Sequence, residues 1–464
     1  MLRILRQYFP ARNAVFLVGE GLLIYASVLI SSVFLLGVDW LTWQALCSRK
    51  ALFITAVFQV CLYYFDLYDY TEIYDFLSWG KRLLQALVCA GIIIASVYYV
   101  FPEVIVSKDV FAVCVIVALV LIVAWRFGYN LVLIRGWFSQ NIMILGSGKL
   151  AVAILEEILA KKDCGYNATM VVQRPEDQER LNCFDPHVAC LGSFGGIGHW
   201  AKERAAKKIV VAITEQRGCF PTTELLNCRL DGIEILEGQS FYEMLAGKLY
   251  VEQLNPGWLV FSEGFDRSLL QTVSKRMADI VLSLVFLIVL MPFLLLTALL
   301  IKLDSAGPVF FTQERVGGKR KIFKIYKFRS MASDAESKSG PVWAQANDDR
   351  VTRIGRFIRP SRIDELPQLW NVLKGEMSIV GPRPEREFFV KQLTELIPYY
   401  IERYTVKPGI TGWAQVNYPY GASVEDAVAK LNYDLFYIKN SSLIMDLMIL
   451  MRTVKIVLSG KGAR

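Results

Sequence analysis

Two adjacent carboxylates lie in a segment that is rich in arginine and proline. Residues 359–385 contain Asp364 and Glu365 and reach a Gly-Pro-Arg-Pro turn at residues 381–384. Carboxylate oxygens bind divalent cations and can attack as nucleophiles, and arginine holds phosphate oxygens through paired hydrogen bonds. The segment therefore predicts a site that handles phosphates together with a divalent cation.

Helix capping is the alternative explanation for the two carboxylates. Acidic side chains stabilise the amino-terminal end of a helix, and a helix is expected to begin near Leu366. The two roles are compatible with each other, so both stay open at this point.

The arginines and prolines of the segment suit phosphate binding. Arg359 and Arg383 are expected to hold phosphate oxygens and to stabilise charge during transfer. Pro382 and Pro384 flank Arg383 and restrict its direction, because proline fixes its own φ. Surface solvation or contact with lipid headgroups is the alternative for each arginine.

The composition places this site at a membrane. Hydrophobic residues make up 54% of the 464 residues, and the mean hydropathy is +0.38. The net charge of +8 suits membrane lipids or phosphorylated substrates, and ordinary positive-inside topology explains it equally well. Lys324 and Lys327 could steer an anionic substrate or bind lipid, and the sequence does not separate these roles. We expect no nucleic-acid partner.

Four apolar runs open the chain, at residues 15–37, 51–65, 84–101 and 110–134. The second is short, but the other three approach the ~20 residues that a bilayer core requires. A cleaved signal peptide is the alternative for the first run, which is too long and lacks a small-residue cleavage site. Basic residues predict that both ends of this bundle face the cytoplasm; on that side lie Arg3, Arg6, Arg12, Lys81, Arg82 and Arg135.

A nucleotide-binding pattern follows the bundle. Residues 141–151 read as a strand and a Gly-x-Gly-x-x-Ala turn before a helix, and residues 208–212 read as another buried parallel strand. An NAD site requires an acidic residue after the second strand, and residues 171–174 offer none. We therefore interpret this part as a structural or regulatory Rossmann-like domain, with a working cofactor site as the alternative.

A fifth apolar run, residues 280–301, contains Pro292 near its middle. Hydropathy alone predicts a transmembrane helix. Lysine and arginine flank both ends, however, and proline kinks a helix. We therefore expect a re-entrant helix that bends at Pro292, with Asp279 near its start paired with Lys275 or Arg276.

Four stretches carry a family resemblance: residues 324–331, 363–369, 380–385 and 406–416. In this order they cover nearly all of the chain from Ser274 onward, and the combination is highly specific. This part resembles the bacterial sugar transferases known as monotopic phosphoglycosyl transferases. With the bundle and the Rossmann-like domain in front, the chain is similar to their large branch, the exopolysaccharide polyprenyl glycosylphosphotransferases.

The resemblance implies a two-step transfer in the catalytic segment. Asp364 attacks the phosphate next to the sugar of a UDP-sugar, expels UMP and holds the phosphosugar covalently. The sugar-1-phosphate then passes to polyprenol phosphate (undecaprenyl phosphate), the first membrane step of exopolysaccharide or other glycoconjugate assembly. Glu365 is expected to bind Mg²⁺, which takes one or two carboxylates plus phosphate oxygens.

The predicted architecture has three parts. They are a membrane α-helical bundle (1–137), an α/β Rossmann-like domain (138–255) and an α-rich α+β catalytic domain (265–464) with a re-entrant membrane helix near 276–302. The expected location is the bacterial inner (cytoplasmic) membrane, with several spans and the catalytic domain facing the cytoplasm.

Two other classes of protein remain as alternatives. One is a membrane scaffold or nucleotide-sensing regulator of polysaccharide synthesis, which has no chemical need for the Asp364 and Glu365 pair. The other is an NAD(P)-dependent oxidoreductase that uses Gly146 and Gly148. The sequence does not identify the transferred sugar, the pathway, the role of the Rossmann-like domain or the oligomeric state. A homodimer is compatible with it.

Overall fold

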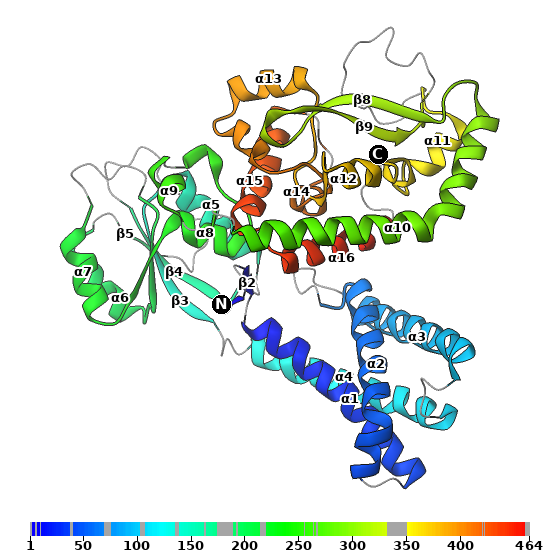
Figure 1. Ribbon diagram of the computed structural model, residues 1–464. Helices are drawn as coiled ribbons and strands as arrows, with labels where there is room; N and C mark the ends of the chain where they lie inside the picture. The colour runs from blue at the N-terminus through cyan, green and yellow to red at the C-terminus, as the bar shows by residue number, and fades with distance from the viewer. Residues whose placement is uncertain are drawn as a thin grey trace. The chain divides into compact units, whose positions relative to one another are not determined.

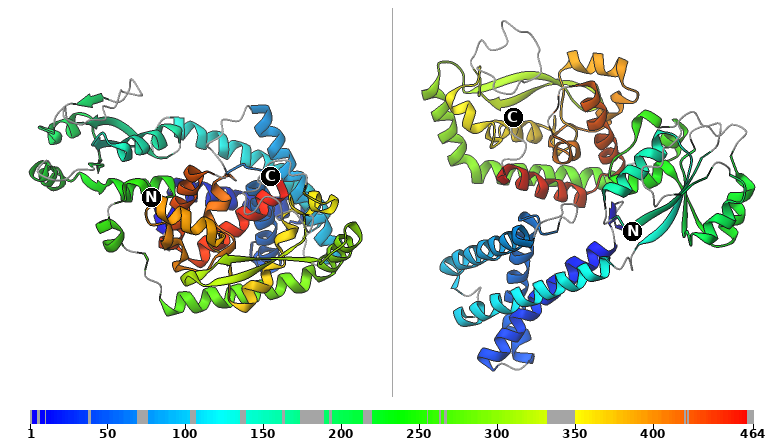
Figure 2. Two further views of the ribbon diagram at one scale, coloured as in Figure 1. Left: turned by 90° about the horizontal axis from the view of Figure 1, so that it is seen from above. Right: turned by 180° about the vertical axis from the view of Figure 1, so that it is seen from behind.

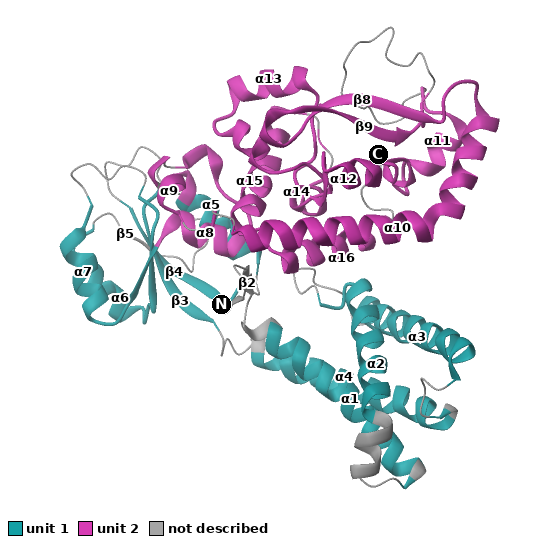
Figure 3. Cartoon of the chain, in the orientation of Figure 1, with its two compact units in different colours: residues 1–3, 8–147, 151–236 teal, residues 4–7, 148–150, 237–464 magenta. Residues whose placement is uncertain are grey.

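The computed structural model divides the chain into two compact units (Figure 3). The amino-terminal unit consists of residues 1–3, 8–147 and 151–236, and the carboxyl-terminal unit of residues 4–7, 148–150 and 237–464. The residues that the structure describes are 2–4, 7–9, 11–37, 40–68, 76–102, 107–134, 139–161, 164–173, 189–191, 194–213, 220–254, 256–262, 264–265, 268–331, 350–419, 421 and 423–459. Arg6 and Arg135, on which part of the orientation prediction rests, lie outside them.

Long apolar helices follow two short paired strands at the start of the chain (Figure 1). The strands are β1 (Leu2–Ile4) and β2 (Gln7–Phe9), and the helices are α1 (Ala11–Leu36), α2 (Trp40–Tyr64), α3 (Phe76–Val100) and α4 (Lys108–Ile134). Within the described residues, segments of α1, α3 and α4 are long and apolar enough to cross a membrane. Many apolar side chains on their outer faces are exposed. These helices indicate a membrane protein.

A buried ion pair connects helices α1 and α4. Arg126 of α4 donates to both carboxylate oxygens of Glu20 in α1, at 2.7 and 3.1 Å, and to the carbonyl of Leu67 at 2.6 Å. The Glu20 side chain is fully buried. Because every charge in a membrane bundle needs a partner, this pair fixes how α1 and α4 face each other.

A parallel sheet with helices on both sides follows the bundle. Its strand order is β5-β4-β3-β6-β7, with parallel pairing for β5-β4, β4-β3 and β3-β6. Figures 1 and 2 show α6 and α7 on one side of the sheet and α5 on the other. The elements are β3 (Gln140–Leu145), α5 (Lys149–Ala160), β4 (Tyr166–Val172), β5 (Ala189–Leu191), α6 (Ile197–Glu203), β6 (Lys208–Val211), α7 (Thr222–Leu230) and β7 (Glu234–Glu237).

Gly146 turns the chain at the end of β3. Its φ is +120°, and a Cβ there would lie 2.6 Å from the carbonyl oxygen of Ala212. Only glycine allows this close approach between the turn and the segment after β6. The predicted strands at 141–145 and 208–212 therefore lie side by side, as β3 and β6.

The carboxyl-terminal unit mixes helices, short 3₁₀ turns (η) and two small sheets. Its sheets are the antiparallel β8-β9 hairpin and the parallel β10-β11 pair. The elements are α8 (Gly238–Ala246), η2 (Val251–Gln253), α9 (Pro256–Phe261), α10 (Leu269–Asp304), β8 (Phe310–Val316), η3 (Gly318–Arg320), β9 (Ile322–Phe328), α11 (Arg353–Ile358), η4 (Ile363–Glu365), α12 (Gln368–Lys374), β10 (Ser378–Val380), α13 (Glu387–Leu396), η5 (Tyr400–Thr405), β11 (Gly409–Thr411), α14 (Trp413–Asn417), α15 (Val424–Asn440) and α16 (Leu443–Ser459).

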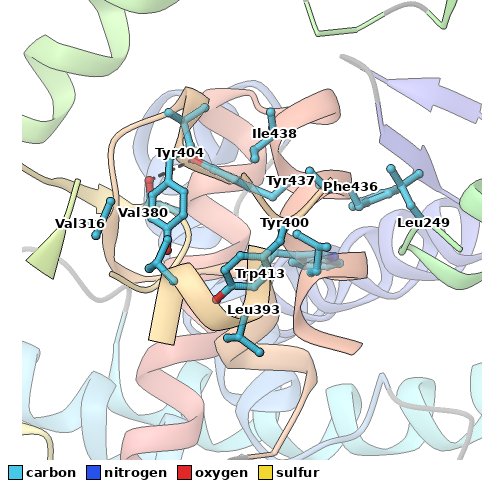
Figure 4. Packing of buried hydrophobic residues seen from close by; sticks show 14 of the residues in the cluster. Leu249, Val316, Val380, Leu393, Tyr400, Tyr404, Trp413, Phe436, Tyr437 and Ile438 are labelled. Carbon is cyan, nitrogen blue, oxygen red and sulfur yellow. Dashed lines mark hydrogen bonds between the residues drawn. The ribbon is translucent and has the colours of Figure 1, made fainter. Parts of the chain in front are cut away.

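Aromatic and branched side chains from distant segments form one core in this unit (Figure 4). Tyr400, Tyr404 and Trp413 belong to it, and the Trp413 ring stacks on Phe436. The indole of Trp413 also donates to the carbonyl of Gly247 at 2.8 Å. These aromatic side chains therefore serve core packing.

Residues 237–254 pack with the carboxyl-terminal unit, although we expected them to belong to the Rossmann-like domain. Leu249, Val251 and Leu254 are buried in the core of the carboxyl-terminal unit. Glu243 of α8 accepts from Lys439 at 2.6 Å and from Asn440 at 2.7 Å. The contacts therefore place the boundary near residue 237.

Helix α10 contains Pro292 and bends part-way along its length (Figure 1). Its apolar side chains are largely exposed, and it is long and apolar enough to cross a membrane. Asp279, which we expected to pair with Lys275 or Arg276, instead accepts from the hydroxyl of Ser378 and the amide of Ile379, both at 3.1 Å. This carboxylate therefore holds β10 against the helix.

Candidate active site

The two carboxylates lie in the turn η4, which leads into α12. Arg362 precedes the turn with a left-handed φ of 55°, a strained conformation for a residue with a side chain. The residue before α12 is Pro367, and no side chain caps that helix. The capping alternative thus finds no support, and the carboxylates are available for another role.

Glu365 is surrounded by positive side chains. Its Oε1 accepts from Arg383 at 2.7 Å and from Lys327 at 2.9 Å, while Arg362 lies 3.6 Å from Oε2. Glu365 is 6% exposed, so these partners replace the water that a charged carboxylate requires. The structure therefore brings together three predicted site residues from β9, η4 and the loop after β10.

Asp364 differs from its neighbour. Its side chain is also buried, but within the described part of the chain no hydrogen bond or ion pair engages its carboxylate. Burial and the adjacent Glu365 raise the pKa of Asp364 to about 6, against the opposing charges of Lys327, Arg383 and Arg359. This carboxylate is not bound by a neighbour, as an attacking nucleophile requires.

The pKa of Glu365 moves in the opposite direction. Burial alone would raise it, but Arg383, Lys327 and Arg362 hold the pKa of Glu365 well below its usual range. Burial lowers the pKa of Lys327, although Glu365 favours its charged form. Environments that separate the pKa values of two carboxylates often mark acid, base or nucleophile roles.

The other predicted residues take different places. Arg359 follows α11 and is close enough to lower the pKa of Asp364 by its charge. Lys324 is exposed on β9, three residues before Lys327, and no described contact joins it to the carboxylates. Pro382 and Pro384 are buried on either side of Arg383.

Asn371 of α12 fixes the strand that carries Lys327. Its amide donates to the carbonyl of Lys324 at 2.7 Å and accepts from the N–H of Tyr326 at 3.1 Å. Arg276 of α10 in turn donates to the carbonyls of Val372 and Leu373 at the end of α12. Helix α10 therefore supports the same helix that follows the two carboxylates (Figure 1).

Sequence reasoning missed the residues that hold Arg383 in place. Arg403 donates to the carbonyl of Arg383 and Arg315 to that of Pro384, both at 3.1 Å. Arg403 lies three residues before the motif at 406–416, which could have drawn attention to it. Arg315 and Asp434, the carboxylate partner of Arg403, carry no comparable signal in the sequence.

The carboxylate oxygens of the pair are donors of the kind that a hard cation such as Mg²⁺ takes, and Oε1 of Glu365 already accepts from Lys327 and Arg383. Asp364 and Glu365 supply neighbouring carboxylate oxygens, and Mg²⁺ is commonly held by one or two carboxylates plus substrate phosphates. Among the described residues, no cluster of three or more His, Cys, Asp or Glu side chains could hold a metal. A cation at this pair would therefore depend on oxygens from the substrate.

Fold and site together are those of a membrane-associated protein with a buried carboxylate pair among basic side chains. The chain matches the bacterial sugar transferase family over residues 270–460 and a CoA-binding domain over residues 64–217.

Curated relatives extend this match beyond the carboxyl-terminal unit. A UDP-glucose:undecaprenyl-phosphate glucose-1-phosphate transferase of Xanthomonas campestris pv. campestris is 31% identical over 99% of this chain and 96% of that protein. An undecaprenyl-phosphate glucose phosphotransferase of Komagataeibacter xylinus is 32% identical over 87% of this chain and 82% of that protein. The UDP-N-acetylgalactosamine-undecaprenyl-phosphate N-acetylgalactosaminephosphotransferase of Aeromonas hydrophila is 44% identical over 52% of this chain and 56% of that protein. The chain belongs to the bacterial sugar transferase family.

Proposed function

We propose that this enzyme transfers a sugar-1-phosphate from a UDP-sugar to undecaprenyl phosphate and releases UMP. The observation that carries the proposal is the contrast within the pair: Asp364 is unbound, while Glu365 is held by Arg383 and Lys327. The relatives from Xanthomonas and Komagataeibacter, which align with most of the chain, are named as undecaprenyl-phosphate glucose phosphotransferases or glucose-1-phosphate transferases.

In the first step, a carboxylate oxygen of Asp364 attacks the phosphorus next to the sugar. The bond from this phosphorus to the bridging oxygen breaks, and UMP leaves with the bonding electrons. A covalent aspartyl-phosphosugar remains. Arg383 and Arg359 hold phosphate oxygens and stabilise the charge that develops during the displacement.

In the second step, a phosphate oxygen of undecaprenyl phosphate attacks the same phosphorus. The bond to Asp364 breaks, which restores the carboxylate and leaves the sugar on a lipid diphosphate. Glu365 is the residue that would hold Mg²⁺ together with phosphate oxygens, and such an ion would supply positive charge against the phosphates. Lys327 keeps Glu365 ionised and supplies a further positive charge at the site.

Helix α10 is proposed to enter the cytoplasmic leaflet and return. Arg276 and Asp279 bind its first half to the carboxyl-terminal unit, and Asp304 at its other end accepts from the amide of Ile354 at 3.2 Å. Arg329 donates to the carbonyl of Ser305, just beyond the helix, at 2.6 Å. Because one compact unit binds both ends, both ends lie on one side of the membrane in this proposal, which puts Asp364 in the cytoplasm.

The parallel sheet is proposed to be a Rossmann-like domain with a structural or regulatory role. Its strand order has β3 at the centre, with the chain adding strands on one side and then on the other. That order is the one expected of a doubly wound fold. We further propose that the product enters exopolysaccharide or related glycoconjugate assembly in the bacterial inner membrane.

A panel of UDP-sugars tests the function. Detergent-solubilised protein is incubated with each sugar nucleotide, Mg²⁺ and undecaprenyl phosphate, and released UMP is quantified. We expect release with at least one UDP-sugar and a lipid-linked product of matching mass. No release with any UDP-sugar from well-folded protein would contradict the proposal.

A further inference from the structure

The loop that carries Arg383 is held by its carbonyl groups. Residues 381–386 form neither helix nor strand. Two of them are prolines, which have no backbone N–H, so carbonyl oxygens must provide much of the anchoring. Four consecutive carbonyls are bound: Pro382 by the amide of Gly409 (2.9 Å), Arg383 by Arg403 (3.1 Å), Pro384 by Arg315 (3.1 Å) and Glu385 by the amide of Val316 (3.0 Å).

Arg403 is itself fixed in the core. Its Nη2, which binds the carbonyl of Arg383, also donates to Asp434 of α15 at 2.8 Å, and its Nη1 donates to the hydroxyl of Tyr400 at 2.6 Å. Its guanidinium also lies over the rings of Tyr400 and Tyr404. The Arg403 and Asp434 side chains are 6% and 2% exposed. The loop is thus bound to a charge pair that cannot easily move.

Fold stability alone does not require this pair. Desolvating two charges costs about as much as their attraction returns, and apolar replacements of buried ion pairs are often neutral. The distinctive contribution of Arg403 is the bond to the carbonyl of Arg383. Because that carbonyl adjoins the Cα of Arg383, holding it restricts the direction of the side chain that meets Glu365.

We propose that Arg403, fixed by Asp434 and assisted by Arg315, is a positioning residue that aims Arg383 at the reacting phosphates. The phosphate part of this inference rests on the proposed transferase function, whereas the anchoring of the loop does not. A misplacement of about 1 Å in such a group can cost roughly 10²-fold in rate.

Two double variants of the full-length protein test the proposal. Arg403→Met with Asp434→Asn removes the anchor without leaving a bare buried charge. Lys439→Met with Glu243→Gln is the matched control, because it removes a buried ion pair of similar length and burial in the same unit. The described contacts of that second pair do not include the loop. Arg403→Lys is a third variant, which keeps the positive charge but lacks the two guanidinium nitrogens that bind separate partners.

Two measurements separate positioning from stability. Hydrogen–deuterium exchange of the peptide that covers residues 379–387 measures how firmly the loop is held, and it does not require enzymatic activity. Initial rates of UMP release give kcat and KM for the UDP-sugar. We expect faster loop exchange and a kcat lowered about tenfold or more in the Arg403/Asp434 variant, with a smaller change in KM. Arg403→Lys should behave similarly at nearly unchanged Tm.

The control decides the interpretation. Lys439→Met with Glu243→Gln should leave loop exchange at the wild-type level and kcat within about threefold, because the described contacts of this pair do not reach the loop. Equal loop exchange in the two double variants would overturn the positioning role. A kcat loss that merely follows Tm in both variants would overturn it as well. Absence of UMP release in the wild type would instead refute the transferase function, while the exchange measurement still decides the anchoring.

Discussion

Arg383 donates to Glu365 across 2.7 Å, and this contact between residues 18 positions apart joins two of the sequence motifs. The same oxygen of Glu365 accepts from Lys327. One carboxylate therefore organises two positive side chains beside Asp364. Glu365→Gln should leave both cations without their counterion and remove a ligand oxygen for Mg²⁺.

For Glu365→Gln we expect a loss of about 10²-fold or more in kcat and a weaker dependence on Mg²⁺. A titration of UMP release against Mg²⁺ measures both effects. Glu387→Gln, which removes an exposed ion pair with Lys391, is the control and should titrate as the wild type does. An unchanged Mg²⁺ titration in Glu365→Gln would remove it as a metal ligand.

Asp364→Asn tests the covalent step. The amide has nearly the same shape but cannot displace UMP, so the phosphosugar adduct should disappear and UMP release should fall to background. Intact-protein mass spectrometry of wild type and variant, each with UDP-sugar alone, checks this. Adduct formation on the Asn variant would assign the nucleophile elsewhere.

The sequence was sufficient to predict those site residues that lie in short motifs. Asp364, Glu365, Lys327 and Arg383 were predicted, and the structure places the last three within hydrogen-bonding distance. Lys324 lies only three residues from Lys327, yet it is exposed and away from the carboxylates. The direction of a side chain on a short strand depends on pairing and packing that the motif does not encode.

Long-range partners were beyond sequence reasoning for the same physical reason. The partner of Asp279 proved to be β10, about 100 residues away, where a pairing with Lys275 or Arg276 was expected. Lys275 instead pairs with Asp446 at 2.7 Å. Such contacts depend on how elements pack in three dimensions, and local spacing carries no information about them.

The rate of transfer should depend on pH through Asp364. Its pKa is raised to about 6 in the substrate-free protein, and only the carboxylate attacks, so kcat/KM should fall as pH decreases through about 6. Lys327 lowers this pKa by its charge. Lys327→Met should therefore move the acid limb of the profile to higher pH.

Lys324→Met is the matched control for this shift, because Lys324 is exposed on the same strand. Its acid limb should coincide with that of the wild type. Profiles of UMP release between pH 5 and 8, the range in which this limb falls, provide the measurement. Coincident limbs for Lys327→Met and wild type would contradict the placement of Lys327 beside the nucleophile.

The bend in α10 should determine the topology. Pro292→Leu restores the missing backbone hydrogen bond and favours a straight helix, which would place the two ends of α10 on opposite sides of the membrane. Activity should fall in this variant, while Met291→Leu, which keeps the proline, should remain active.

Cysteine labelling reads this topology directly. Single cysteines at Thr272 and Lys321, in a background without native cysteines, should resist an impermeant thiol reagent added outside intact cells. Both should react once the inner face is exposed. Labelling at position 321 from outside, in protein that retains Pro292, would rule out the re-entrant arrangement.

The contacts of residues 237–254 predict where a minimal catalytic fragment must begin. A fragment of residues 265–464 lacks Glu243 and leaves the charge of Lys439 without its partner. It also loses the carbonyl of Gly247 that accepts from Trp413, together with the buried side chains of Leu249 and Val251. A fragment of residues 237–464 keeps all of these contacts.

We therefore expect residues 237–464 in detergent to melt cooperatively at a clearly higher Tm than residues 265–464, and to retain UMP release. Adding Lys439→Met to the shorter fragment removes the unpaired charge and should recover part of the difference in Tm. In the longer fragment the same substitution leaves Glu243 without its partner and should lower Tm. The sign of the change in Tm therefore depends on whether α8 is present. Equal Tm values and equal activity for the two fragments would place the functional boundary at residue 265, as the sequence alone indicates.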